Sequence, residues 1–349
     1  MKIPDQTLLS ILADGQFHSG PELGRQTGRT RTAIWKIIKS LQQQGVVIYS
    51  VRGKGYRLAE PIELLNQEAI HAAFDNIAMS GFSQSGDLPV INVLRRLEVF
   101  HDIQSTNAYL LEAAKRGESS GFACLAEQQQ AGRGRRGRQW VSPFGGNLYL
   151  SLLWQFNAGA SQLGGLSLAI AVAVMRALRE TGLTTSGIKW PNDILVGGRK
   201  LAGILLELAG EAAGPCAVVV GVGLNVRAAE SKMTTVAQPW TDLESELGKP
   251  VARNLLAAQL LYQLIIAVRE FESQGLRPFL KEWAMHDVFM DREVCLDLAQ
   301  GQIQGIARGV DESGALLLAV AGEEQGTVQR FHSGEVSMRA AVTGGRDTR

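Results

Sequence analysis

Residues 132–138 read GRGRRGR, and Trp140 stands two positions beyond them. Four arginines interleaved with three glycines cannot belong to a hydrophobic core, so this segment is expected to form a loop. Glycine lets a backbone approach a ligand closely, and arginine binds phosphate or carboxylate through two parallel hydrogen bonds. The segment therefore indicates a loop that closes on an anion. A nucleic-acid-binding loop or a flexible solvated segment is the alternative.

A second motif, KWPND at residues 189–193, is followed by KLAGIL at residues 200–205. Residues 194–196 and 201–208 are expected to pair as a hairpin, across which Asp193 and Lys200 can converge. A lysine directed into a pocket there neutralises charge that develops on a carboxylate or an α-phosphate. The alternative is an ordinary ion pair on the surface of a hairpin.

A third motif, GVGLN, occupies residues 221–225 at the end of the apolar run 218–224. Its alternating glycines allow close backbone approach, and Asn225 can hydrogen-bond a base or a ribose. The motif is weak by itself, because strand glycines also mark bends and bulges. The five histidines have no metal-ligand spacing and form no Ser-His-Asp arrangement, so we expect neither a metal site nor covalent catalysis by a protein nucleophile.

Composition limits the class of protein. The chain has 349 residues, of which 45% are hydrophobic, which excludes wholesale disorder and predicts about two to three domains. Three widely spaced cysteines exclude a disulfide framework and a zinc module. The longest apolar run, residues 166–178, is too short to span a bilayer, and no export signal is evident. We therefore expect a cytoplasmic protein that does not enter a membrane.

The first 60 residues form a basic head on a mildly acidic body. They hold nine Lys/Arg and four Asp/Glu, a charge of about +5, which leaves about −4 for the remainder. Helices are expected at residues 5–14, after a capping box at Ser19, and at residues 30–44 with Thr30 as the cap. Strands at 46–51 and 56–58 follow, joined by the basic turn 52–55. This order predicts a winged helix-turn-helix.

The third of these helices has two faces. Its apolar side chains fall in one sector, at the spacing of a packed helix: Ala33, Ile34, Ile37, Ile38 and Leu41. The opposite sector and the basic turn carry groups suited to bases and phosphates, and the expected DNA contacts are Arg29, Thr30, Arg31, Thr32, Trp35, Lys36, Lys39, Arg52 and Lys54. A three-helix protein-interaction domain with a solvated basic face is the alternative.

Beyond the head, the pattern predicts an α+β chain of several domains. A helix at 66–79 and a loop at 80–87 lead into strands at 93–100, 123–128, 147–156, 194–196, 201–208 and 218–224. These strands alternate with helices at 107–115, 166–181 and 254–273. Short strands at 294–298, 303–310, 315–320 and 328–331 predict a small β-barrel. We divide the chain into a winged helix (1–61), a helical linker (62–92), a mixed-sheet domain (93–286) and a C-terminal barrel (287–341).

Taken together, the motifs resemble those of the biotin–protein ligase family. The resemblance rests on STN at residues 105–107, the stretch QQQAGRGRRGR at 128–138, and the KWPND, KLAGIL and GVGLN motifs. With the winged helix it extends over about residues 5 to 340 and matches the bacterial bifunctional ligases that also repress the biotin operon. It implies a catalytic domain like that of class II synthetases and an SH3-like C-terminal barrel. Lipoate ligases share the fold but lack this pair of motifs.

The resemblance implies two chemical steps and a regulatory role. Biotin and ATP with Mg²⁺ give biotinyl-5′-AMP, and a lysine of the biotin carboxyl carrier protein of acetyl-CoA carboxylase then takes the biotinyl group. The adenylate is also the corepressor: it promotes a homodimer that binds the biotin operator. Two alternatives stay open, a non-catalytic biotin-sensing winged-helix regulator and a ligase whose winged helix no longer binds an operator.

The resemblance also implies roles for individual residues. Lys200 and Arg135 are the catalytic pair. The biotin-binding residues are Ser105, Thr106, Asn107, Gln129, Arg133, Gly134, Arg135 and Lys200. The residues for ATP and the adenylate are Arg135, Arg138, Lys189, Asn192, Asp193, Asn225 and Trp240.

Overall fold

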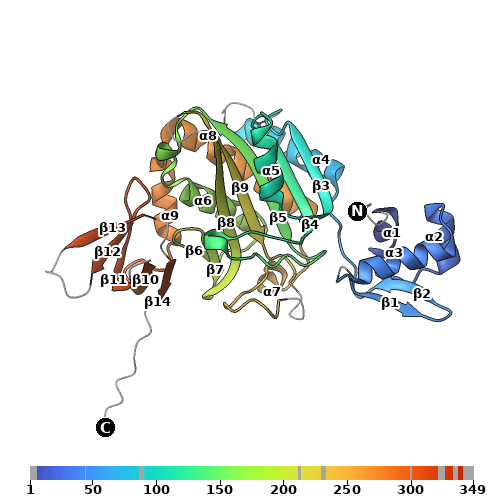
Figure 1. Cartoon of the computed structure of the whole chain (residues 1–349). Coiled ribbons are helices and arrows are strands. Elements are labelled where there is room, and N and C mark those ends of the chain that lie inside the picture. The colour runs from blue at the N-terminus through green and yellow to red at the C-terminus, as the bar shows by residue number, and fades with distance from the viewer. Residues whose placement is uncertain are drawn as a thin grey trace, which may run out of the picture.

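The structure is a computed structural model, and it describes residues 6–43, 45–85, 90, 92–210, 214–228, 233–298, 301–320, 327–332 and 337–340. Its elements fall into three units in chain order: a helical head with a hairpin, a seven-stranded sheet covered by helices, and a five-stranded sheet (Figure 1). The predicted α+β organisation in several units is confirmed.

The head contains α1 (Gln6–Leu12), α2 (Gly20–Thr27), α3 (Arg31–Gln43), β1 (Ile48–Val51) and β2 (Gly55–Leu58). Local signals set its helix ends. Ser19 and Glu22 form the predicted capping box, and Gly28 ends α2 in the left-handed region at a φ of 67°. The Thr30 hydroxyl accepts the Ala33 N–H at the start of α3. The predicted order of three helices and a hairpin is confirmed.

The central sheet has the strand order β3-β4-β5-β9-β8-β7-β6. Its strands are β3 (Arg96–Ile103), β4 (Phe122–Gln129), β5 (Leu148–Phe156), β6 (Ser186–Lys189), β7 (Asp193–Val196), β8 (Arg199–Gly210) and β9 (Cys216–Leu224). Only β3 and β4 pair in parallel, whereas the other neighbours are antiparallel. The predicted mixed sheet is therefore confirmed, with β6 as an edge strand that the sequence did not indicate.

Helices cover both faces of this sheet. The main core lies on the face covered by α4 (Gln67–Ser85), α6 (Leu166–Glu180) and α8 (Arg253–Gln274), while α5 (Thr106–Lys115) covers the other face (Figure 1). Shorter elements connect them: α7 (Leu243–Leu247), α9 (Leu280–His286), and the 3₁₀ helices η1 (Arg135–Gly137), η2 (Ala160–Leu163) and η4 (Arg277–Phe279).

One predicted loop is wrong over part of its length. Residues 80–85 continue α4 as helix, and residues 86 and 87 lie outside the described residues. The preceding turns of the helix are fixed by packing, because Ile70, Phe74 and Ala78 are buried in the central core. A glycine in a helix costs only about 1 kcal/mol, so packing upstream outweighs the weak propensity of this serine- and glycine-rich stretch.

The C-terminal unit is an antiparallel sheet of order β13-β12-β11-β10-β14. Its strands are β10 (Glu293–Leu298), β11 (Gly301–Val310), β12 (Leu316–Val320), β13 (Val328–Phe331) and β14 (Ser337–Ala340), the last of which was not predicted. Over the described residues β13 and β14 are the two edges, so the antiparallel sheet is confirmed and its closure into a barrel is not seen. The Trp190 indole N–H donates to Gly314 O, which joins this unit to the central one.

The wing turn provides a matched test of the head. Gly53 and Gly55 both have positive φ, but a Cβ on Gly55 would lie 2.0 Å from His18 O, whereas one on Gly53 would meet nothing within 4 Å. We expect Gly55→Ala to break the paired hydrogen bonds between His18 and Tyr56, and Gly53→Ala to cost only about 1–2 kcal/mol of backbone strain. Hydrogen exchange of the Tyr56 amide measures this. Equal loss of protection in both variants would contradict the expectation.

Candidate active site and nucleic-acid interface

A cavity of about 440 Å³ lies between the central sheet and the arginine-glycine loop, and its size is typical of small-molecule sites. Most of the residues singled out from the sequence line it: Ser105, Thr106, Asn107, Gln129, Arg133, Gly134, Arg135, Arg138, Asn192, Asp193 and Lys200. Lys189, Asn225 and Trp240 are not among its lining residues. Segments far apart in the sequence thus meet at one place.

Strand register builds the floor of the cavity. Asp193, Gly203, Gly223 and Tyr149 are successive neighbours across β7, β8, β9 and β5. The Trp140 indole lies against the two glycines, since a Cβ would be 2.4 Å from the ring at Gly223 and 2.9 Å from it at Gly203. The close approach expected of GVGLN is therefore made by a protein side chain. The sequence did not mark Trp140 as a site residue, because the glycine row becomes visible only through the register.

Lys200 and Asp193 form an ion pair inside the cavity. The Lys200 Nζ lies 2.7 Å from Asp193 Oδ1, and only 15% and 14% of the two side chains are exposed. The same Nζ lies 5.3 Å from the centre of the Trp140 ring, at cation–π distance. The predicted convergence across the hairpin is confirmed, and the pair is not an ordinary surface contact. The cation is held where a ligand in the cavity can reach it.

The arginine-glycine loop is anchored at two points. Arg135 Nη1 donates to Asn192 Oδ1 over 3.1 Å, and Arg133 Nη1 lies 3.0 Å from Glu207 Oε1. Burial lowers the pKa of Arg135, and the nearby Arg138 and Arg136 lower it further while Asp193 raises it. Arginine stays protonated under such conditions, so the loop places positive charge over the cavity.

Lys189 adds to the positive charge behind the loop. It pairs with Asp193 in the register of β6 and β7. Burial lowers the pKa of Lys189, and so do Lys200 and Arg138, while Asp193 opposes the shift. Cations that lower each other's pKa stabilise an anion placed between them. This end of the cavity is suited to phosphate and carboxylate groups.

The other end of the cavity is polar, and its lining residues Thr106, Asn107 and Gln129 are uncharged. Gln129 Oε1 accepts from the backbone N–H of Thr106 over 2.9 Å and lies 3.1 Å from its hydroxyl. Ser151 Oγ lies 2.6 Å from Asn107 Oδ1, and Asn107 Nδ2 donates to Glu207 Oε2 over 2.9 Å. The sequence did not single out Ser151 and Glu207, which reach this cluster from β5 and β8. Such an array suits an uncharged ring with several hydrogen-bonding groups.

Asn225 and Trp240 lie behind Lys200. Asn225 Nδ2 donates to Thr241 O over 3.0 Å, while Asn225 Oδ1 is buried without a hydrogen-bond partner among the described residues. Trp240 forms a parallel bridge with Lys200, and residues 235–238 of the same segment line the cavity. These two residues therefore support the segment beside Lys200 in this structure.

A second candidate surface lies on the head. All nine residues predicted to contact DNA are exposed, including Trp35 at 50%, while Ile34, Ile38 and Leu41 bury the opposite face of α3. In the wing, Arg57 stacks near Phe17 and Tyr49, with the guanidinium carbon 5.1 and 5.3 Å from the ring centres. One face of the helix packs and the other is free to contact a duplex.

Among the residues that the structure describes, no group of three or more His, Cys, Asp and Glu side chains is placed to hold a metal ion. Over the same residues, every helix is too short or too polar to cross a bilayer.

Family models match all three units. The biotin/lipoate A/B protein ligase family model matches residues 99–225, an HTH domain model matches 5–57, and a biotin protein ligase C-terminal domain model matches 289–339. Among solved structures, a biotin protein ligase from Aquifex aeolicus in complex with biotin and ATP superposes with a TM-score of 0.60 at 28% identity, covering 71% of this chain and 100% of that one.

Full-length relatives are more similar still. The bifunctional ligase/repressor BirA of Salmonella typhimurium is 44% identical over 336 residues, which cover 96% of this chain and 97% of the relative. That of Escherichia coli is 43% identical over 335 residues, with the same coverage. The chain therefore belongs to the family of bifunctional biotin ligases and repressors.

Proposed function

We propose that the cavity joins biotin to ATP as biotinyl-5′-AMP and passes the biotinyl group to a lysine of the biotin carboxyl carrier protein of acetyl-CoA carboxylase. The observation that carries this proposal is the single cavity with a cationic end at Lys200, Arg135 and Arg138 and a neutral polar end at Thr106 and Gln129. A carboxylate ligand with an uncharged hydrogen-bonding ring fits these two ends. The protein would act in the cytoplasm.

The first step brings two anions together. A biotin carboxylate oxygen attacks the α-phosphorus of ATP, the bond to the β-phosphate oxygen breaks, and pyrophosphate leaves. Lys200 and Arg135 offset the repulsion between the anions and the charge that develops, so positioning and electrostatics do the work without a protein nucleophile. Mg²⁺ is expected to accompany ATP as its counterion.

In the second step the acceptor amine attacks the biotinyl carbonyl, and AMP leaves. The arginine-glycine loop protects the mixed anhydride from water until then. Ser105, Thr106, Asn107 and Gln129 hold the ureido ring and the valeryl chain, and Arg133 with Gly134 covers them. Arg138, Lys189, Asn192 and Asp193 serve the phosphates. Asn225 and Trp240 reach the adenine once the segment at 235–241 moves.

The repressor activity uses the head. Biotinyl-5′-AMP that meets no acceptor promotes dimerisation through the central sheet, and two heads then bind a two-part biotin operator. In this scheme residues 1–61 bind DNA, residues 62–92 link them to the catalytic unit at 93–286, and residues 287–341 contribute to ATP and carrier-protein binding. The number of cations at this end of the cavity argues against a sensor without turnover, because the one carboxylate of biotin needs fewer partners than Lys200, Arg135 and Arg138 together provide.

Replacing Lys200 tests the chemistry. Lys200→Ala removes the cation and leaves the Asp193 carboxylate facing two anionic substrates, so we expect adenylate formation to slow by about 100-fold or more. Pyrophosphate release and the mass gain of a carrier domain measure the two steps. Lys115→Ala is the matched control, because that lysine is 64% exposed and pairs with Glu112 on the surface of α5, outside the cavity. Near-normal biotinylation by Lys200→Ala would refute the assignment.

Replacing lysines of α3 tests the nucleic-acid interface. Lys36→Ala and Lys39→Ala each remove an exposed cation, so each should weaken binding to a DNA duplex and lower the slope of log affinity against log salt by about 1. Biotinylation should not change. Fluorescence anisotropy over a salt series measures this, on a duplex that the wild type selects from a random pool. Lys281→Ala on α9 is the control, and an effect as large there would count against the interface.

A further inference from the structure

The segment at residues 61–66, between β2 and α4, is held along its whole length. Each of its six residues has a backbone group hydrogen-bonded to a residue outside the segment. The partners, in order, are Arg227, Ala13, Arg253, Asn254, Glu127 and Asn254. Linkers between domains are usually mobile and make few contacts. This one has about as many backbone hydrogen bonds per residue as an edge strand of a sheet.

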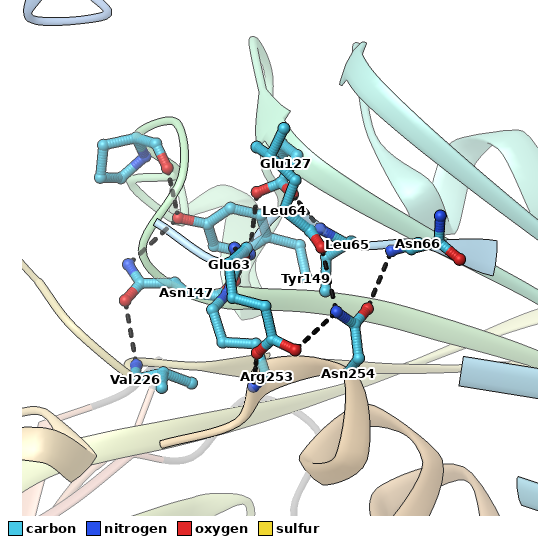
Figure 2. A network of polar contacts seen from close by, with 11 residues as sticks. Glu63, Leu64, Leu65, Asn66, Glu127, Asn147, Tyr149, Val226, Arg253 and Asn254 are labelled. Atoms are coloured by element: carbon cyan, nitrogen blue, oxygen red, sulfur yellow. Dashed lines mark hydrogen bonds and ion pairs between the residues drawn. The ribbon is translucent and has the colours of Figure 1, made fainter. Parts of the chain in front are cut away.

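A buried arginine is the centre of these contacts (Figure 2). Arg253 and Glu127 form an ion pair whose side chains are 5% and 0% exposed, with Nη2 2.9 Å from Glu127 Oε2. The same guanidinium donates to Glu63 O and Asn147 O, each over 2.7 Å. The second carboxylate oxygen of Glu127 accepts the N–H of Leu65. One ion pair therefore joins α8, β4 and the linker.

Glu63 closes the arrangement from the linker side. Its carboxylate accepts the backbone N–H of Arg253 and the side-chain amide of Asn254. The N-cap residue of α8, Ala252, has no side chain that can cap the helix, so the linker supplies the acceptor for a free N–H at the positive end of the helix. Asn254 returns two hydrogen bonds, to Leu64 O and from the Asn66 N–H.

Apolar side chains fix the same segment on both sides. Ile62 and Leu64 pack with the core of the head, which also takes in Phe144 from the central unit. Leu65 is buried in the core of the central unit. Neighbouring linker residues thus pack in different cores. The segment cannot rotate without exposing an apolar side chain of one core or the other.

We propose that Arg253, Glu127, Glu63 and Asn254 form a linker clamp that fixes the direction in which the head leaves the catalytic unit. In a dimer, that direction sets the separation of the two α3 helices and therefore the half-site spacing that the protein accepts. Arg253 is then a positioning residue for DNA recognition, although it contacts neither DNA nor substrate. The effect on half-site spacing rests on the proposed function, because it requires a dimer on a two-part operator. The clamp itself does not depend on that function.

A distance measurement tests the clamp without DNA. Spin labels at Gln26→Cys on the head and Lys115→Cys on α5 are specific, because Cys124, Cys216 and Cys295 are buried. We expect one narrow distance in the parent. Arg253→Lys keeps the charge but loses the planar guanidinium that makes several hydrogen bonds at once, and Glu63→Gln presents an N–H donor to one of the two N–H groups that Glu63 now accepts. Each should broaden the distribution toward that expected for a free six-residue linker, whose r.m.s. end-to-end distance is roughly 12–15 Å.

Two controls separate the clamp from a general loss of structure. Glu282→Gln makes the same carboxylate-to-amide change in an ion pair with Arg176, away from the linker, and should leave the distance narrow. Glu63 is exposed and lies outside the cavity, so Glu63→Gln should keep normal biotinylation. Distributions as narrow as the parent's in both Arg253→Lys and Glu63→Gln would overturn the clamp.

A spacing series tests the consequence for recognition. The two half-sites of the selected duplex are moved apart one base pair at a time, and affinity is measured with biotin and ATP present. We expect the parent to discriminate against altered spacings at least about ten-fold more strongly than Glu63→Gln. Equal discrimination overturns the positioning role. A parent that never binds as a dimer refutes the proposed repressor mechanism, while the distance measurement still decides the clamp.

Discussion

The buried ion pair between Arg253 and Glu127 connects more of this molecule than any single packing contact described above. Its burial is permissible only because every oxygen and most N–H groups of the pair find partners, and removing one member of such a pair costs about 3–5 kcal/mol. Those partners lie in the linker and at Asn147, just before β5, while the pair itself joins β4 to the N-terminus of α8. Through Asn147 the contacts continue to the hydroxyl of Tyr149, whose residue lines the cavity. The position of the head and the shape of the cavity are therefore both linked to the same buried group.

The register of the central sheet aligns the residues that form the floor of the cavity. Lys200, Asp193 and the two glycines beneath Trp140 come from three strands, and their alignment follows from backbone pairing. A slip of one residue in β8 or β9 would turn the floor of the cavity toward the opposite face of the sheet. A residue next to Gly203 or Gly223 would then face the loop in place of the glycine. Its side chain would occupy the space that the Trp140 indole fills. The anion-binding loop can cover the site only because the sheet leaves room for its tryptophan.

Much of this architecture was predictable, because it is encoded locally. The capping box at Ser19 acts within a few residues and is present as predicted, and the structure brings most of the residues of the sequence motifs to one cavity. What the sequence did not show depends on non-local pairing. Ser151 and Glu207 have no motif of their own, and β6 and β14 are four-residue edge strands whose existence follows from their neighbours. Asn225 and Trp240 were assigned by resemblance, and the structure places them behind Lys200, where they hold a segment that borders the cavity.

One continuous stretch of chain, residues 132–144, connects the cavity to the head. From Gly132 it forms the loop over the cavity, places Trp140 on the sheet, accepts the Tyr149 hydroxyl at Pro143 O, and inserts Phe144 into the core of the head. A ligand that binds the loop therefore contacts residues that lie close in sequence to Phe144, and Phe144 packs in the core of the head. A ligand shifts a conformational equilibrium only through contacts that differ between its states, so an effect of the ligand on the head requires that contacts of this stretch change when the ligand binds. A molecule bound under the arginine-glycine loop is thus only a few residues along the chain from Phe144 and its contacts with the head.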